Sequence, residues 1–111
     1  MAINWDDFEK IDMRVGTVIE VNDFPAARKP AYQLTIDFGE KVGIKKSSAQ
    51  ITVHYKKEDL LNRQVIAVIN FPPKQIASFI SECLVLGVYD ENKDVILLMP
   101  EKLSGNGYKI G

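Results

Sequence analysis

The chain has 111 residues, of which 46% are hydrophobic and 26% charged, and its formal net charge is −1. This balance predicts a single domain over residues 1–111 and argues against a surface that is basic all over, as in a general nucleic-acid-binding protein. No apolar run approaches the roughly 20 residues that span a bilayer, and Asp6, Asp7 and Glu9 lie where a signal peptide carries positive charge. We therefore expect a cytoplasmic protein.

A short helix, one strand and a stiff loop are predicted for the first 30 residues. In Trp5–Ile11, acidic side chains precede apolar residues spaced three apart, which is typical of one or two helical turns. Arg14–Val21 is rich in β-branched residues and predicts a strand, in which Gly16 is suited to a bend or a bulge. The prolines of Phe24–Pro30 then indicate a stiff connection.

Two further strands are expected next. Apolar and polar residues alternate in Tyr32–Phe38, so one face of this strand should lie against the core while the other is exposed. Val42–Lys46 predicts a third, short strand. Ser47 or Ser48 is then expected to cap a brief helix over residues 49–51.

The second half of the chain adds a helical link and more strands. Val65–Ile69 is short, apolar and β-branched, as in a buried strand, and Tyr55–Leu61 before it indicates a short helical or irregular segment. Cys83–Tyr89 and Val95–Met99 flank an acidic turn and predict a hairpin. Five or so short strands with a small helical insertion favour an all-β protein whose sheet closes into a barrel, rather than a sandwich.

Two prolines end the buried strand abruptly. Pro72 and Pro73 lack the amide proton that a central ladder needs, so the segment that follows is expected to be irregular. Its apolar side chains and one lysine make it the candidate surface: Phe71, Lys74, Ile76, Phe79 and Ile80. Three interpretations are open, because these side chains can stack on nucleic-acid bases, bind an extended peptide or a second copy of the chain, or pack into the core.

Basic residues are concentrated in the middle of the chain. Residues 41–80 hold seven lysines and arginines against two acidic residues, although the chain as a whole is slightly acidic. Such asymmetry predicts either a basic face that attracts phosphate or acidic peptide, or a solvated surface of short basic pairs such as Lys45 and Lys46.

The sequence offers little for catalysis. His54 has no nucleophile or acid–base partner beside it along the chain, and the single cysteine, Cys83, lies in an apolar run where a thiol acts as a small hydrophobic group. One cysteine makes no intrachain disulfide or cysteine metal set, and the acidic N-terminal residues lack the spacing of a calcium loop. Since no phosphate-binding glycine motif is present either, we expect a binding module without catalytic residues, metal or cofactor.

Five stretches stand in a specific order and spacing over nearly the whole chain: Asp12–Gly16, Phe24–Arg28, Ile36–Gly39, Ser47–Thr52 and Asn70–Gly87. Together they resemble the CsaA proteins, which belong to the wider set of tRNA-binding domains. The resemblance implies an OB-fold, a five-stranded Greek-key barrel with short helices, whose terminal extensions pair two chains into a homodimer. It also implies a chaperone role in protein export, in which unfolded or precursor polypeptide is bound without nucleotide. For the wider family it implies tRNA binding.

The RNA-binding pattern of that wider family is matched only in part. Asn70 and Ser81 match it, whereas Gln75 and Ala77 stand where it carries cations, and each lost cation removes a phosphate partner. The segment is thereby more apolar, which favours a polypeptide groove edged by Lys45, Lys46 and Lys74. The resulting peptide-binding candidates are Phe71, Lys74, Ile76, Phe79 and Ile80. For the alternative, an RNA-binding module, the candidates are Lys45, Lys46, Asn70, Lys74 and Ser81.

Overall fold

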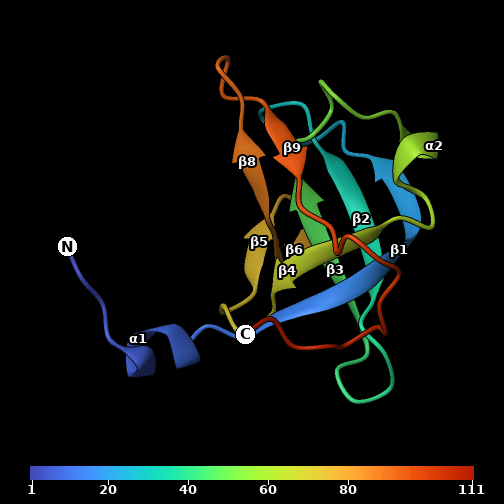
Figure 1. Cartoon of the computed structure of the whole chain (residues 1–111). Helices are drawn as coiled ribbons and strands as arrows, with labels where there is room; N and C mark the ends of the chain where they lie inside the picture. The colour runs from blue at the N-terminus through green and yellow to red at the C-terminus, as the bar shows by residue number, and fades with distance from the viewer.

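Five strands form one antiparallel sheet that curls into a nearly closed barrel (Figure 1). The computed structural model describes residues 1–111. The strands are β1 Met13–Asp23, β2 Tyr32–Asp37, β3 Ile44–Ala49, β4 Gln64–Val68 and β7 Leu84–Val85. Their order in the sheet is β3-β2-β1-β4-β7, so β4 returns to lie beside β1, as in a Greek key. The expectation of an all-β, five-stranded barrel of the OB-fold type is confirmed.

Two short helices and two small hairpins complete the fold. They comprise α1 Trp5–Glu9, α2 Lys57–Leu60, β5 Lys74–Ile76 paired with β6 Phe79–Ser81, and β8 Gly87–Tyr89 paired with β9 Val95–Leu97. The hairpin predicted around the acidic turn is present, although the strand expected before it is divided into β7 and β8. Neither helix has the length and apolar character needed to cross a lipid bilayer.

Alternate residues of the strands fill the interior of the barrel. Leu34, Ile36 and Phe38 are at most 1% exposed, so the predicted inward face of β2 is confirmed. The pattern is readable from sequence because successive side chains of a strand point to opposite faces. The main core cluster consists of Val18, Leu34, Ile36, Phe38, Ala49, Ile51, Tyr55, Leu60, Val65, Ala67, Cys83 and Leu97.

The N-terminal arm, residues 1–11, stands apart from the barrel (Figure 1). Asn4 Oδ1 accepts a hydrogen bond from the Asp7 N–H at 2.9 Å, and the Asp7 carboxylate accepts one from the Asn4 N–H at 3.2 Å. This capping box starts α1 where the acidic residues predict a helix. No residue of α1 is buried, and Trp5 is 82% exposed. The chain's own barrel therefore leaves the apolar side chains of the arm uncovered.

The strand β3 runs further than its sequence indicates. It continues through Ser47 and Ser48 while paired with β2, so the prediction of a serine-capped helix after Lys46 is wrong. Ser47 Oγ donates a hydrogen bond to the Cys83 carbonyl at 2.9 Å, and the Ser48 N–H donates one to Ser81 Oγ at 3.1 Å. Both serines are thus bonded across the fold rather than along the chain, which removes the local capping bond that the prediction assumed.

Gly16 lies in a regular ladder with β4, not at the predicted bulge. The register of β1 against β2 shifts instead between Val18 and Glu20. A Cβ atom added to Gly16 would lie 2.6 Å from Cγ2 of Ile36 and 2.7 Å from Cδ1 of Phe38, which is closer than carbon atoms approach. Glycine is therefore required here because the large, fully buried side chains of Ile36 on the neighbouring strand β2, and of Phe38 directly after it, fill the space that a Cβ atom would occupy.

The segment after the two prolines is a regular hairpin rather than irregular chain. The strand β4 ends at Val68, before Pro72 and Pro73, in line with the prediction that this strand stops there. Three cross-strand pairs then join β5 to β6 around a two-residue turn. In this turn Ala77 has a φ of 53°, in the left-handed region, where glycine or asparagine is usual. Because neither turn residue is one of these, the sequence carries no hairpin signal.

We predict that Gly16→Ala lowers the free energy of unfolding by about 2 kcal/mol, because the added methyl group overlaps Ile36 and Phe38 inside a packed core. Urea unfolding followed by circular dichroism measures the change. Gly111→Ala is the control, since its methyl group would meet nothing within 4 Å, and it should stay within about 0.5 kcal/mol of wild type. A Gly16→Ala variant as stable as the control would contradict the close-contact explanation.

Candidate functional site

Two hollows adjoin on one flank of the barrel, where the β5–β6 hairpin lies beside the end of β3. Their volumes are about 380 and 670 Å³, and both are lined by Ser48, Gln50, Lys74 and Ile76. We call the two hollows together the groove. Its apolar half is further lined by Phe71, Pro72, Ser81, Glu82, Cys83 and Leu84. Its basic half is further lined by Ala26, Ala27, Arg28, Lys29, Ala31, Gln75 and Ala77.

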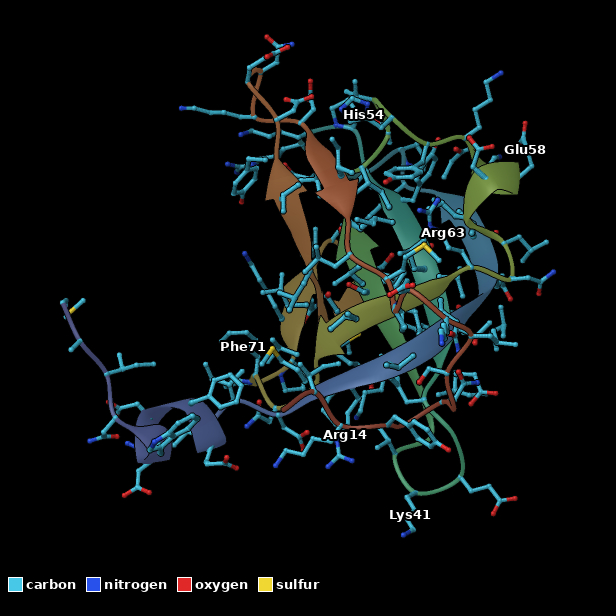
Figure 2. The ribbon with its side chains drawn as sticks, in the orientation of Figure 1. Arg14, Lys41, His54, Glu58, Arg63 and Phe71 are labelled. Atoms are coloured by element: carbon cyan, nitrogen blue, oxygen red, sulfur yellow. The ribbon has the colours of Figure 1, made fainter.

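Three of the five peptide-binding candidates lie together in the groove: Phe71, Lys74 and Ile76. Phe71 is 55% exposed, and Figure 2 shows it on the flank of the barrel next to the N-terminal arm. Lys74 and Ile76 are two residues apart on β5 and therefore share a face of that strand. Leu84, which sequence reasoning did not single out, is 47% exposed on the same wall. The apolar half thus offers large hydrophobic side chains to solvent.

Phe79 and Ile80 do not line the groove, contrary to expectation. Phe79 is 9% exposed, and its ring centroid lies 5.4 Å from that of Phe24 in a second core cluster with Ala31. Ile80 is 53% exposed, but it faces the opposite side of β6 from Ser81, because neighbouring residues of a strand alternate. The core interpretation therefore holds for Phe79, and Ile80 lies on a separate surface.

Of the three lysines expected along the groove, only Lys74 lines it. Lys45 and Lys46 lie earlier on β3, where Lys45 is half-buried and Lys46 exposed. The Lys46 backbone is bonded to Glu82 on the outer edge of β3, and this pairing covers that part of the strand. Neither lysine is among the residues that line the groove, and their place at its edge stays a prediction.

Sequence reasoning missed two cations of the basic half, Arg28 and Lys29, because they lie in the loop after β1. That loop is brought to the hairpin by the packing of Phe24 on Phe79. This contact joins segments far apart in the chain, so no local pattern reveals it. Lys74 adds a third cation, and no lining residue of the basic half is acidic. The basic half should therefore attract anionic groups.

Asn70 and Ser81, two of the RNA-binding candidates, use polar atoms to hold the fold. Asn70 Oδ1 accepts a hydrogen bond from the Asp12 N–H at 3.0 Å, and its Nδ2 donates one to the Lys10 carbonyl at 2.7 Å. These bonds tie the end of β4 to the start of β1. Ser81 Oγ accepts the hydrogen bond from the Ser48 N–H. Asn70 is not among the residues that line the groove, whereas Ser81 is.

Cys83 is buried, as its apolar neighbours in the sequence predict, and it contributes a hydrophobic part of the apolar half. It is 6% exposed, and burial raises the pKa of its thiol to about 11. The thiol is therefore protonated at neutral pH and is a poor nucleophile. Its Sγ lies 3.8 Å from the carbonyl oxygen of Lys46. At this position the groove supplies packing surface rather than reactive chemistry.

Outside the groove, His54 lies beside two carboxylates, at the end of the barrel that carries the β8–β9 turn (Figure 2). Its Nε2 is 2.7 Å from Oδ2 of Asp90, and the ligand atoms of these residues and Asp94 all lie within 4.8 Å of one another. Hydrogen bonds from the Asp94 backbone and from His54 hold the pKa of Asp90 below its ordinary value. These bonds connect the loop after β3 to the β8–β9 turn.

A family model described as a putative tRNA binding domain matches residues 13–109. The chain belongs to this tRNA-binding-domain family. Two solved structures share the fold of this tRNA-binding domain over its whole length. The CsaA chaperone protein from Picrophilus torridus is 55% identical with a TM-score of 0.93, covering 99% of this chain and 100% of that one. Chaperone CsaA from Bacillus anthracis is 50% identical with a TM-score of 0.93, covering 100% of both chains. The resemblance to CsaA proteins is confirmed.

Curated relatives of this tRNA-binding domain include methionine–tRNA ligases. That of Pyrococcus abyssi is 40% identical over 110 residues, which is 99% of this chain and 15% of the enzyme. That of Pyrococcus horikoshii is 39% identical over 108 residues, or 97% of this chain and 14% of the enzyme. The chain thus spans a small part of the length of these relatives, and the similarity concerns one portion of each enzyme.

Phe79→Ala is expected to lower the free energy of unfolding by about 3 kcal/mol, because it empties the second core cluster. Phe71→Ala should change it by less than about 1 kcal/mol, since most of that ring already faces water. Urea unfolding of both variants measures the difference. A greater loss for Phe71→Ala than for Phe79→Ala would show that the two rings have been assigned to the wrong environments.

Proposed function

We propose that the protein is a CsaA-type chaperone that acts as a homodimer in the cytoplasm and holds unfolded or precursor polypeptides for export, without nucleotide or other cofactor. The observation that carries this proposal is the apolar half of the groove, where Phe71 and Leu84 are exposed although both are large and hydrophobic. Full-length similarity to two CsaA chaperones supports it. A non-catalytic role is supported by a groove whose only thiol is buried and protonated.

Unfolded polypeptide has the chemistry that this surface can bind. Covering exposed hydrocarbon yields about 25 cal/mol per Å², so a few hundred Å² yields several kcal/mol before the cost of ordering the chain is subtracted. A micromolar affinity requires about 8 kcal/mol net, so a single groove is expected to bind more weakly than that. Because burial of apolar surface is not directional, the same groove can accept many different sequences. This tolerance suits a protein that holds chains before they fold.

Homodimer formation through the two ends of the chain is part of this proposal. Ile3, Trp5 and Phe8 of the N-terminal arm and Gly111 at the C-terminus enclose a hollow of about 550 Å³. Ile3 and Trp5 are highly exposed in one protomer, so a second copy would remove their apolar surface from water. A two-fold dimer would carry two grooves, and two weak sites on one body raise the avidity for a long chain.

RNA binding is the second candidate, favoured by the family description and by the similarity to methionine–tRNA ligases. The exposed cations Arg28, Lys29 and Lys74 could contact phosphate. The hairpin, however, supplies no cation at Gln75 or Ala77. We therefore rank RNA binding below polypeptide binding.

The two functions respond differently to salt. We expect the affinity for reduced, carboxymethylated α-lactalbumin, a permanently unfolded polypeptide, to fall much less between low and high salt than the affinity for tRNA. Apolar burial is not screened, and only the basic half of the groove adds ionic contacts. Total tRNA should bind weakly and lose affinity steeply as salt rises. Fluorescence anisotropy of each labelled ligand measures both.

Two variants test whether the unfolded polypeptide binds in the groove. Phe71→Ala should weaken polypeptide binding several-fold, whereas Ile80→Ala, which removes an equally exposed side chain outside the groove, should not. Tight, salt-labile binding of tRNA together with no binding of the unfolded polypeptide would reverse the ranking. Arg28→Ala combined with Lys29→Ala would then be expected to reduce RNA affinity.

Sedimentation equilibrium tests the dimer. The wild-type chain should sediment with twice the mass of one protomer, and Trp5→Asp should shift it toward monomer because a charge would be buried in the interface. Val53→Asp is the control, since Val53 is exposed on a loop of the barrel and does not line the hollow at the chain ends. A wild-type chain that sediments as a monomer at all concentrations contradicts the proposal.

A further inference from the structure

One stretch of strand edge is open along the groove. The strand β3 pairs with β2 on one side only. On its other side, the Lys46 carbonyl accepts a hydrogen bond from the Glu82 N–H at 2.7 Å, and the Lys46 N–H donates one to Glu82 Oε1 at 3.0 Å. The Ser48 N–H donates to Ser81 Oγ at 3.1 Å, and this is the last hydrogen bond on that edge.

Two backbone groups extend the same edge without a partner. In a strand, the N–H and C=O of one residue point to the same side, and residues two apart point the same way. The Ser48 carbonyl therefore faces the side of β3 that lies away from β2. Gln50 follows the last residue of β3, Ala49, and in the trans peptide between them the Gln50 N–H points opposite to the Ala49 carbonyl, which faces β2, so this N–H also faces away from β2. Neither makes a hydrogen bond within the protein. Ser48 and Gln50 both line the two halves of the groove, so these groups lie at its wall.

We propose that an extended polypeptide segment adds to β3 at Ser48–Gln50 as a further strand. This inference rests on the proposed function and specifies how the polypeptide is held. An N–H of the segment would donate to the Ser48 carbonyl, and a carbonyl of the segment would accept from the Gln50 N–H, as in other cases of β-strand addition. An acceptor and a donor at this spacing match the alternating N–H and C=O groups of an extended polypeptide backbone.

The side chains of the added strand face the two halves of the groove. Residues two apart lie on one face of a strand, about 7 Å from each other. One such side chain would meet Phe71 and Leu84 in the apolar half. The other would reach the basic half, whose cations are Arg28, Lys29 and Lys74. Charge complementarity therefore selects a segment with an apolar residue and an acidic residue two positions apart.

Alternate N-methylation of a peptide tests the backbone pairing directly. The probe is a fluorescein-labelled decapeptide of serine and threonine with a central Leu-Thr-Glu, and a Leu-Thr-Lys version tests charge selection. Two further versions carry N-methyl groups, one on the odd residues and one on the even residues. In an extended chain the N–H groups of odd and even residues point to opposite sides, so each version blocks one side of the peptide. One methylated version should bind about tenfold more weakly than the parent and the other within about twofold of it. The lysine version should also bind more weakly.

Gln50→Pro removes the other hydrogen bond of the proposed pairing, the one that the Gln50 N–H donates to the segment, because proline has no N–H. We expect it to weaken binding of the parent decapeptide about tenfold, whereas Gln50→Ala, which keeps the N–H and loses only a side chain of the groove wall, should weaken it much less. Thermal unfolding confirms that each variant is folded before it is titrated. If Gln50→Pro does not fold, the methylated peptides decide the question with the wild-type protein alone.

The outcomes separate this inference from the proposed function. Equal affinities of the two methylated peptides, or equal effects of Gln50→Pro and Gln50→Ala, overturn strand addition while leaving the binding of unfolded polypeptide intact. If carboxymethylated α-lactalbumin does not bind either, the proposed function fails with it. Binding of total tRNA without binding of either the decapeptide or carboxymethylated α-lactalbumin overturns both. Strand addition is supported if the two methylated peptides bind with different affinities and if Gln50→Pro binds the decapeptide more weakly than Gln50→Ala does.

Discussion

The barrel is closed by a short seam of hydrogen bonds between β3 and residues 81–83, and the groove begins where this seam ends. The strands β3 and β7 are the two edges of the sheet, so a connection between them is needed for closure. Glu82 supplies it with its backbone and its side chain, and Ser47, which is 1% exposed, bonds the Cys83 carbonyl. A buried hydroxyl without such an acceptor would be costly. Because the seam follows β3 only as far as Ser48, the last part of the strand edge remains open.

The β5–β6 hairpin connects the stability of the protein to its candidate site. One of its residues, Phe79, packs against Phe24 in the second core cluster and thereby fixes the loop that carries Arg28 and Lys29. Phe71, which precedes the hairpin, leaves its ring exposed in the groove. The same short insertion therefore holds the loop in place and forms one wall of the groove. A groove built in this way is preformed, which lowers the ordering cost of binding.

Regular periodicity is what made parts of this structure predictable. The alternation in β2, the apolar run of β4 and the acidic start of α1 each depend on neighbours along the chain, and each prediction is confirmed. Phe71 and Phe79 could not be distinguished in this way, because only contact with the distant Phe24 buries one of them. The role of Gly16 likewise depends on Ile36 and Phe38, which lie far from it in the sequence and pack against it in the fold. Ser47 or Ser48 is predicted from the sequence to cap a helix, but both form hydrogen bonds to residues 81–83 instead, and these distant partners are not visible in the local sequence.

The position of Trp5 has a consequence for spectroscopy. It is the only tryptophan in the chain, and it lies on the N-terminal arm, 82% exposed and outside both core clusters. Tryptophan fluorescence therefore reports on the surroundings of the arm and should change little when the barrel unfolds. Emission from a lone protomer would already be red-shifted in the native state, and a blue shift on concentration would signal that a neighbour has covered the ring.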